Sequence, residues 1–455
     1  MSRANELPGL RAYMHLEAQR SDNINRVLYD VQFYPWNVAD EDPVFAVTGR
    51  EDVLVCRAVS RNNDAVEILQ WIKDGDLLEE KVGTDDRSHT LGSNSLTWAQ
   101  SPVGEPLVCV SGGYSKVKLY NALTGTLYRV LHGHGSSVND LKTSPQSPSI
   151  IASASYDRGI RLWDLGRSPD EDPCAVLCSG GGHREGVLAM GFHRSGRYLL
   201  SGGLDQAINL WVLPDLQDRP TNFTSCQAVH YPHFSTTELH NGYVDCVTFF
   251  DDLVLSKAAE ENRIVLWKID GFSSRNSPPK PETAPTISQL RGTRSAFGNK
   301  FQRLLQFGAP KTDLFYMRFS LFHEFDKSPI LVIGDEKSAL HWWDLQRLEE
   351  DNEFDFPSSK ARGPRKQKDK TALWAMREPS ITSEASSSRA SVNPGPTVAK
   401  RKSPVSDPFT GIPSHKKITV PRVGFPTRQI AWSKGGEWMV AVGDWGMICL
   451  FKRWD

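Results

Sequence analysis

The chain lacks the features that would assign it to several large classes of protein. Its formal net charge is -1, from 53 basic and 54 acidic residues, so it has no overall excess of positive charge for nucleic acid or an anionic membrane. No apolar run approaches the roughly 18 residues of a membrane span. The first 20 residues are charged and contain no apolar stretch of the signal-peptide type. We therefore expect neither membrane insertion nor secretion.

Cysteine patterns and catalytic motifs are missing as well. The seven cysteines form no Cys-x-x-Cys pair, which argues against a disulfide framework or a zinc ribbon and favours a reducing compartment. The sequence has no Gly-x-x-x-x-Gly-Lys phosphate loop, no Gly-x-Ser-x-Gly elbow and no His-Glu-x-x-His motif. The gaps between His230, His233 and His240 match no common zinc pattern, so we interpret these residues as loop histidines. We predict a protein that is not an enzyme and holds no metal or other cofactor.

What the chain does have is tryptophan and internal repetition. Thirteen tryptophans favour β structure, because large aromatic side chains suit half-buried strand faces. Residues 150–164 (IIASASYDRGIRLWD) and 198–212 (YLLSGGLDQAINLWV) share an apolar pair, small residues, an aspartate and a tryptophan six positions after it. A Gly-His pair precedes each unit, at residues 133–134 and 182–183. This is the signature of the WD repeat, which forms one four-stranded propeller blade per 40–45 residues or so. We expect the aspartate to bind the loop histidine and the tryptophan to pack beneath them, a structural role.

Weaker copies of the unit extend the series along the chain. They lie at residues 44–57, 107–120, 253–267, 330–344 and 438–455. Segments with an apolar or aromatic anchor are expected to form the inner strands of the blades: 27–33, 93–98, 136–141, 185–192, 242–249, 314–319 and 426–432. The sequence therefore predicts an all-β fold, a seven-bladed WD40 β-propeller over residues 26–455 that follows an N-terminal extension, residues 1–25. We expect an N-terminal strand to complete the last blade and close the ring.

Two stretches interrupt the repeats. Residues 271–300 are rich in proline and serine and are predicted to form a long surface loop. Residues 349–418 begin with an acidic run and become basic and serine-rich, a composition that predicts disorder. The short basic runs at 365–370 and 400–402 leave two interpretations open, a solvated spacer or a patch for nuclear import or nucleic acid. Outside this insert we expect no direct binding to nucleic acid.

The inner strands of a propeller begin around one mouth of its central channel. The positions expected at similar depth there are Tyr29, Asn94, Ser137, Leu188, Asp245, Phe315 and Arg428, with Tyr316 beside Phe315. Three of these are aromatic residues from blades one and six, and the arginine of blade seven lies between those blades. Clustered aromatic faces can hold a quaternary ammonium by cation–π attraction, and an arginine can bind a carbonyl or carboxylate of the ligand. The spacing also fits aromatic side chains that only pack the loops.

Five segments carry a pattern more specific than the general WD signature. They are VLYDVQFYPW (27–36), GHGSSVNDLK (133–142), GGHREGVL (181–188), HYPHFSTTELHNGYVDCVTFFDDLVLSK (230–257) and DLFYMRFS (313–320). Together they resemble the EED/Extra sex combs family, the seven-bladed WD-repeat subunits of Polycomb repressive complex 2. The resemblance runs from about residue 27 to the C-terminus and is interrupted by a fungal-type insert, which we place between blades six and seven.

The resemblance implies a non-catalytic scaffold and histone reader that acts in the nucleus in transcriptional repression. In that family an aromatic cage at the propeller mouth binds the trimethyl-lysine mark made by the complex's own catalytic subunit. Position by position, the cage aromatics fall on Tyr29, Phe315 and Tyr316. The peptide-binding arginine falls on Arg428. The fourth cage position falls on Asn94, which is not aromatic and predicts weaker binding unless another aromatic completes the cage.

The resemblance also implies partners. In the family the narrower underside of the ring holds a helix of the methyltransferase, and Val138, Asn139 and Leu141 lie in a matching segment here. The implied partners are an Enhancer-of-zeste-type SET-domain methyltransferase, a Suppressor-of-zeste-type subunit and a methylated histone tail. The repeats alone leave a second class open, a general WD-repeat adaptor such as a ubiquitin-ligase substrate receptor or a histone chaperone that reads another peptide. An aromatic mouth favours the methyl-lysine reader, whereas a ring of arginine and lysine would favour phosphopeptide binding.

Overall fold

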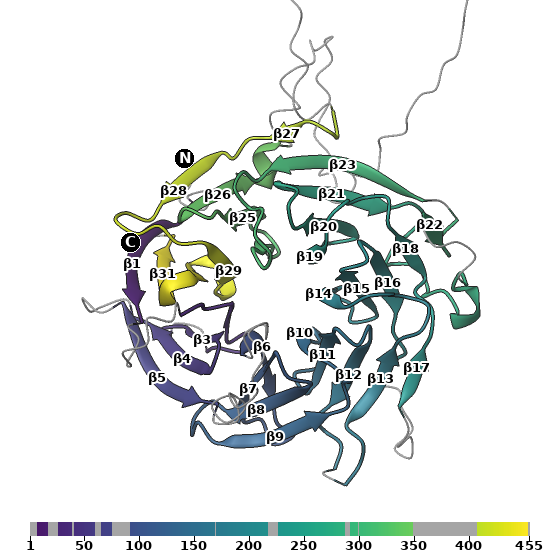
Figure 1. Cartoon of the computed structure of the whole chain (residues 1–455), viewed down its shortest axis with the longest axis horizontal. Helices are drawn as coiled ribbons and strands as arrows, with labels where there is room; N and C mark the ends of the chain where they lie inside the picture. The colour runs from purple at the N-terminus through teal and green to yellow at the C-terminus, as the bar shows by residue number, and fades with distance from the viewer. Residues whose placement is uncertain are drawn as a thin grey trace, which may run out of the picture.

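The computed structural model describes residues 7–16, 26–38, 41–59, 65–74, 92–168, 170–216, 226–286, 292–298, 300–348 and 407–453. In this part of the chain the strands form seven sheets, arranged as blades around a central channel (Figure 1). The all-β, seven-bladed propeller predicted from the repeats is therefore confirmed. Within the described ranges, no helix has the length and apolar character needed to cross a membrane.

The first three blades follow one another along the chain. Blade one contains β2 (Asp30–Phe33), β3 (Val44–Gly49), β4 (Asp52–Ala58) and β5 (Val66–Lys73). Blade two contains β6 (Ser93–Gln100), β7 (Pro106–Gly112), β8 (Lys116–Asn121) and β9 (Leu127–His132). Blade three contains β10 (Val138–Thr143), β11 (Ile150–Ser155), β12 (Ile160–Asp164) and β13 (Cys174–Cys178), with β17 (Gln227–Val229) added in parallel at its outer edge.

The next two blades also gain an edge strand from a distant segment. Blade four contains β14 (Val187–Phe192), β15 (Tyr198–Gly203), β16 (Ile208–Val212), β18 (Phe234–Thr236) and β22 (Thr293–Ser295). Blade five contains β19 (Val244–Phe250), β20 (Leu253–Ala258), β21 (Arg263–Ile269), β23 (Phe301–Gly308) and β27 (Gly411–Ile412).

The last two blades complete the ring. Blade six contains β24 (Phe319–Phe322), β25 (Ile330–Gly334), β26 (Ala339–Asp344) and β28 (Lys416–Thr419). Blade seven contains β29 (Thr427–Trp432), β30 (Trp438–Gly443), β31 (Met447–Lys452) and the N-terminal strand β1 (Gly9–His15). Short 3-10 turns lie at η2 (Pro281–Thr283), η4 (Lys434–Gly436) and η5 (Asp444–Gly446).

The N-terminal strand closes the ring. β1 pairs antiparallel with β31, from Gly9 opposite Lys452 to His15 opposite Met447. It thereby covers the edge that β31 would otherwise expose, and unpaired sheet edges are prone to aggregation. The closing strand was expected, but the boundary at residue 26 is wrong, because part of the supposed N-terminal extension belongs to blade seven. No repeat motif marks β1, since an outer strand needs mainly its backbone for pairing.

The two inserts also differ from their predicted form. The segment 271–300 is not only a surface loop, because it contains η2 and the edge strand β22, which pairs with β18. Residues 349–406 of the second insert lie outside the described residues. Residues 407–418, which we assigned to the same disordered insert, contribute β27 and most of β28. The insert therefore interrupts blade six between β26 and β28, and does not separate blades six and seven.

Six of the seven expected inner strands overlap the observed ones over most of their length, and blade six is the exception. Its inner strand β24 begins at Phe319, whereas we expected a strand over residues 314–319. A turn precedes β24, and in it Tyr316 adopts a left-handed backbone conformation with φ 61°. Such a conformation is costly for a bulky side chain and marks a position that its surroundings hold in place.

The tryptophans of the repeats end a series of buried hydrogen bonds, as blade three illustrates. Trp163 is fully buried and its Nε1–H donates to Ser153 Oγ over 2.7 Å. The same serine oxygen lies 2.7 Å from His134 Nε2, and His134 Nδ1 lies 2.8 Å from Asp157 Oδ2. Burial alone would raise the pKa of the Asp157 carboxyl, but its hydrogen bonds with His134 and two backbone amides lower it to about 2. The structural role predicted for this aspartate and histidine is therefore confirmed.

Blade four repeats the chain of hydrogen bonds, and blade five contains a variant of it. In blade four His183 bonds to both Asp205 and Ser201. Trp211 donates to the same Ser201 oxygen. In blade five His240 Nδ1 lies 2.6 Å from Glu261 Oε2, and Ser256 joins His240 to Trp267. His240 is 1% exposed, and its burial lowers its pKa despite the neighbouring carboxylate. A glutamate thus replaces the expected aspartate, and for this reason the sequence motif did not reveal the role of His240.

Candidate functional site

Three aromatic side chains meet at the mouth of the channel. The ring centroids of Tyr29 and Tyr316 are 6.0 Å apart with an interplanar angle of 64°. Those of Phe315 and Tyr316 are 4.3 Å apart at 71°. Tyr29 and Phe315 are half-buried, and Tyr316 is 8% exposed. The structure therefore brings together the three aromatic residues that we predicted at the mouth, with faces set at steep angles to one another.

The strained turn before β24 is held by a buried carboxylate. The backbone N–H of Tyr316 donates to Asp245 Oδ2 over 3.2 Å. Asp245 lies on β19 of the neighbouring blade, is 1% exposed, and forms an ion pair with Lys257. Its burial raises its pKa, although Lys257 and Arg318 oppose this effect. Asp245 therefore does not line the surface of the mouth as predicted but supports it from below.

The hydroxyl of Tyr316 is fixed by two asparagines. Asn94 Nδ2 donates to Tyr316 Oη over 3.1 Å, and the same oxygen lies 3.4 Å from both side-chain and backbone oxygens of Asn139. Asn94, the non-aromatic cage position, is half-buried, and its Oδ1 has no hydrogen-bond partner among the described residues. Asn94 thus lies beside the aromatic cluster and contributes an amide to it.

Arg428 connects the two sides of the cluster. Its Nε and Nη2 donate to Asp444 over 2.6 and 2.9 Å, and its Nη1 donates to the carbonyl of Phe315 over 2.7 Å. The guanidinium carbon lies 5.9 Å from the ring centroid of Tyr29. A bidentate arginine–carboxylate pair has well-defined geometry, so Arg428 braces the turn that carries the aromatic residues. Its contact with a bound peptide stays a prediction.

The remaining residues that we predicted at the mouth or in the partner groove offer little accessible side-chain surface for binding. Leu188 is fully buried, and Ser137 donates a hydrogen bond to the Gly113 carbonyl, so neither adds a recognition group at the mouth. Val138, Asn139 and Leu141, which we assigned to the groove for the methyltransferase helix, are at most 1% exposed. Their burial does not support that assignment, which stays a prediction, because a groove that binds a helix needs accessible side chains.

A buried ion pair that the sequence did not reveal crosses the channel beneath the cluster. Arg318, two residues after Tyr316, donates through Nη1 to Asp140 Oδ1 over 2.9 Å and through Nη2 to the Leu188 carbonyl over 3.0 Å. Burial alone would raise the pKa of Asp140, but Arg318 and Lys142 lower it. The guanidinium also lies 5.1 Å from the Tyr316 ring centroid. The only sequence signal was the presence of charged residues within otherwise apolar inner-strand segments.

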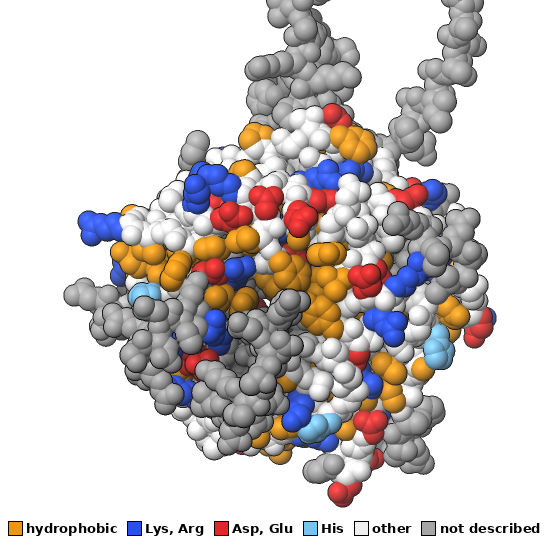
Figure 2. Space-filling view, viewed as in Figure 1, with side chains coloured by type: hydrophobic (Ala, Val, Ile, Leu, Met, Phe, Trp, Pro, Cys, Tyr) orange, Lys and Arg blue, Asp and Glu red, His pale blue; other side chains and the backbone are white. Residues whose placement is uncertain are grey.

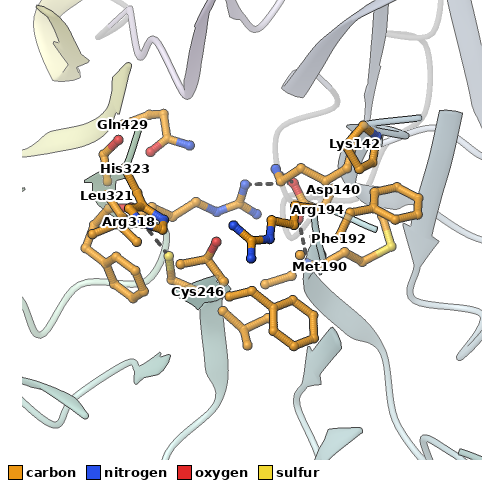
Figure 3. Close-up of a pocket in the computed structure, with 18 of the residues that line it drawn as sticks. Asp140, Lys142, Met190, Phe192, Arg194, Cys246, Arg318, Leu321, His323 and Gln429 are labelled. Atoms are coloured by element: carbon orange, nitrogen blue, oxygen red, sulfur yellow. Dashed lines mark hydrogen bonds and ion pairs between the residues drawn. The ribbon is translucent and has the colours of Figure 1, made fainter. Parts of the chain in front are cut away.

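A cavity of about 490 Å³ lies against this ion pair. The paired Asp140 and Arg318 are among its lining residues, and Met190, Phe192 and Cys246 contribute apolar surface (Figure 3). The described residues contain no cluster of three or more His, Cys, Asp and Glu side chains that could hold a metal ion. On the face of the ring shown in Figure 2, hydrophobic side chains gather beside the opening of the channel.

Comparison with known proteins identifies relatives of the chain. The family model for the WD domain, G-beta repeat, matches residues 125–164 and 174–212. The chain is 40% identical to Polycomb protein EED of Chaetomium thermophilum over 71% of this chain and 57% of that protein. It is 26% identical to Polycomb protein esc of Drosophila melanogaster, with 74% of each chain covered. The chain thus aligns with little more than half the length of the Chaetomium protein.

Solved structures of a Chaetomium thermophilum complex contain a similar chain. One, of ctPRC2 in complex with H3K27me3 and H3K27M, matches with a TM-score of 0.81 and 32% identity, over 100% of this chain and 99% of that chain. Another, of apo ctPRC2 in an autoinhibited state, matches with a TM-score of 0.80 and 33% identity, over 100% of this chain and 99% of that chain. The likeness therefore extends over the whole ring and is accompanied by clear sequence identity.

Proposed function

Because the chain belongs to the EED/Extra sex combs family of WD-repeat proteins, we propose that it is the non-catalytic scaffold and histone reader of a Polycomb repressive complex 2-type lysine methyltransferase. Its reader site is the mouth formed by Tyr29, Phe315 and Tyr316, and its ligand is a histone tail that carries trimethyl-lysine. The observation that carries this proposal is the meeting of three aromatic rings from two blades at one end of the channel.

The chemistry of the mouth suits a methylated ammonium group. Methylation removes the N–H donors of lysine, so the cation loses less hydration on entering an apolar site and presents more surface to the rings. Attraction between a cation and an aromatic face contributes up to about 2 kcal/mol when the pair is desolvated. The ring angles of 64° and 71° leave faces that are not parallel, as adjacent walls of a cage require. A relative's solved structure is described as a complex with H3K27me3, which is the ligand we propose here.

Arg428 and Asn94 affect how tightly this site binds its ligand, in opposite directions. Arg428 holds the Phe315 carbonyl and so fixes the turn before the ligand arrives, which lowers the ordering cost of binding. Asn94 provides no aromatic face, so the cage has one wall fewer. We therefore expect a preference for methylated over unmodified peptide that is real but smaller than a complete cage would give.

The scaffold function follows from family membership. The proposed partners are those that the family resemblance implies, an Enhancer-of-zeste-type methyltransferase and a Suppressor-of-zeste-type subunit. The occurrence of a similar chain in solved ctPRC2 complexes supports assembly into a complex of this kind. Because this complex modifies histones, the protein acts in the nucleus in transcriptional repression. The general adaptor is less well supported, because the one arginine that we placed at the mouth is already bound to Asp444, whereas phosphopeptide recognition relies on clusters of available arginines.

Titration calorimetry with the full chain tests the reader function. A histone H3 tail peptide trimethylated at lysine 27 should bind more tightly than the unmodified peptide. Tyr29→Ala should bring the two affinities to within about twofold, because it removes one ring face worth roughly 0.5–2 kcal/mol. Tyr29 is a suitable position because it is half-buried and its loss should disturb the fold less than the loss of Tyr316.

Tyr128→Ala is the matched control. Tyr128 is 42% exposed on the outer strand β9, away from the mouth, so its removal should leave both affinities unchanged. Equal affinity of the wild-type chain for the two peptides would overturn the reader function. Co-purification of a SET-domain methyltransferase from nuclear extract tests the scaffold function separately, since that contact does not require the cage.

A further inference from the structure

Two cysteine thiols lie against each other at the outer edge of blade three. Cys174 is the first residue of β13, and Cys226 immediately precedes β17, which pairs in parallel with β13. The residues are 52 positions apart in the sequence, yet their Sγ atoms are 3.2 Å apart. Both cysteines are free thiols. Only a short movement of the sulfurs therefore separates this pair from bonding distance.

The two thiols differ in accessibility, and this sets their chemical roles. Cys174 is 2% exposed, whereas Cys226 is half-buried and the other five cysteines are buried. Burial raises the pKa of the Cys174 thiol to about 12, although Arg161 Nη1, 3.6 Å from its sulfur, opposes the shift. A small oxidant therefore reaches Cys226 first. Cys178 lies on the same strand as Cys174 but is fully buried.

We propose that Cys174 and Cys226 form an oxidation site that closes to a disulfide in the presence of hydrogen peroxide. The Cys226 thiolate attacks one peroxide oxygen, the O–O bond breaks, and the leaving hydroxide takes up a proton to become water. The resulting sulfenic acid is attacked by the sulfur of Cys174, the S–O bond breaks, and a second water leaves with the proton of Cys174. Two thiols are oxidised and one peroxide is reduced to two waters.

The disulfide would fix β17, the outer edge strand of blade three, to its neighbour β13. β17 is held to β13 by three residue pairs, and the chain continues from it into β18 of blade four. A bond between residues 174 and 226 closes a loop that contains the three inner strands of blade four, β14 to β16. Such a link restricts the unfolded chain and should stabilise this side of the ring. In a reducing compartment the link would be transient and reversible.

Peptide mapping of the native full chain tests the proposal. The protein is treated with a small excess of hydrogen peroxide, alkylated in denaturant without reductant, and digested with trypsin. We expect the number of free thiols to fall by two, and we expect one new linked peptide that contains residues 174 and 226 and disappears on treatment with dithiothreitol. The melting temperature of the oxidised protein should rise relative to the untreated protein.

Three variants make the assignment specific. Cys226→Ser and Cys174→Ser should each abolish the linked peptide, while Cys178→Ser, the matched control from the same strand, should leave it unchanged. In Cys174→Ser, dimedone should trap a sulfenic acid at Cys226. A link that survives in Cys226→Ser, a link to Cys178, or no linked peptide in a protein that melts as a folded chain would each overturn the proposal.

Discussion

Blades three to five and the channel mouth differ in how far apart in the sequence their hydrogen-bonded side chains lie. In blades three to five, one buried histidine per blade (His134, His183 and His240) pairs with an acidic residue 21 to 23 positions later, and a serine links it to a tryptophan. At the mouth, the hydrogen bond between Asn94 and Tyr316 joins residues 222 positions apart. The repeated local arrangement supports the ring, and the departures from the repeat form the recognition site that we propose.

The largest effect should come from breaking the repeated arrangement. Trp163→Ala removes a fully buried indole that packs with residues of blades two and three and donates to Ser153. We expect a loss of about 3–5 kcal/mol in the free energy of unfolding, the usual range for a buried tryptophan. Urea denaturation followed by circular dichroism measures it, with Tyr128→Ala as the exposed control. A loss below about 1 kcal/mol would show that the tryptophan does not hold the blades together.

Acidification should weaken the same arrangement in blade five. Burial alone would raise the pKa of Glu261, but its contact with His240 lowers it from 4.5 to about 2 in the folded protein. Its stabilisation is therefore present above pH 4.5 and lost as the pH falls through about 2, on the order of 3 kcal/mol. The pKa of His240 is lowered too, so proton uptake by the unfolded chain below pH 6.5 or so destabilises the fold in the same direction.

Glu261→Gln separates this contribution from general acid unfolding. The variant should be less stable than wild type at pH 7, and the difference should shrink as the pH falls towards 2. Thermal melts at several pH values provide the measurement. A stability difference that does not change between pH 7 and pH 3 would contradict the assignment of a charged Glu261 to the arrangement.

The smallest effect should come from completing the mouth. Asn94→Tyr adds an aromatic face at the non-aromatic cage position, and it should tighten binding of the trimethylated peptide by roughly 0.5–2 kcal/mol. Affinity for the unmodified peptide should change less, because a primary ammonium keeps more of its hydration. Calorimetry on both peptides measures the difference. Equal tightening for both would mean that the new ring provides general contact and does not recognise methylation.

The repeated part of the fold could be predicted from the sequence because the residues that define each repeat lie close together along the chain. The spacing of Asp157 and Trp163 within one unit, with its Gly-His pair nearby, was enough to predict the buried hydrogen bonds of blade three. Glu261 interrupted the pattern and hid the equivalent contact of His240. β1, β22 and β27 were missed or misassigned because edge strands pair through the backbone and leave little trace in side-chain spacing.

The channel mouth could be predicted only in part from the sequence. Tyr29, Phe315 and Tyr316 were found from their positions at the starts of inner strands and from family resemblance, and the structure places their rings together. The ion pair of Arg318 with Asp140 was not found, because it joins blades three and six across the channel and no local spacing in the sequence relates the two residues. The burial of Val138, Asn139 and Leu141 was also not apparent, since a short polar and apolar segment does not reveal which face it presents.

A crystal structure of the chain with a histone H3 peptide trimethylated at lysine 27 tests the central claim most directly. The account predicts the methylated nitrogen within about 6 Å of the ring centroids of both Tyr29 and Tyr316, with Arg428 still bound to the Phe315 carbonyl and Asn94 at the open side. A peptide bound elsewhere on the ring, with the three aromatic side chains unchanged and in contact only with one another, would contradict it.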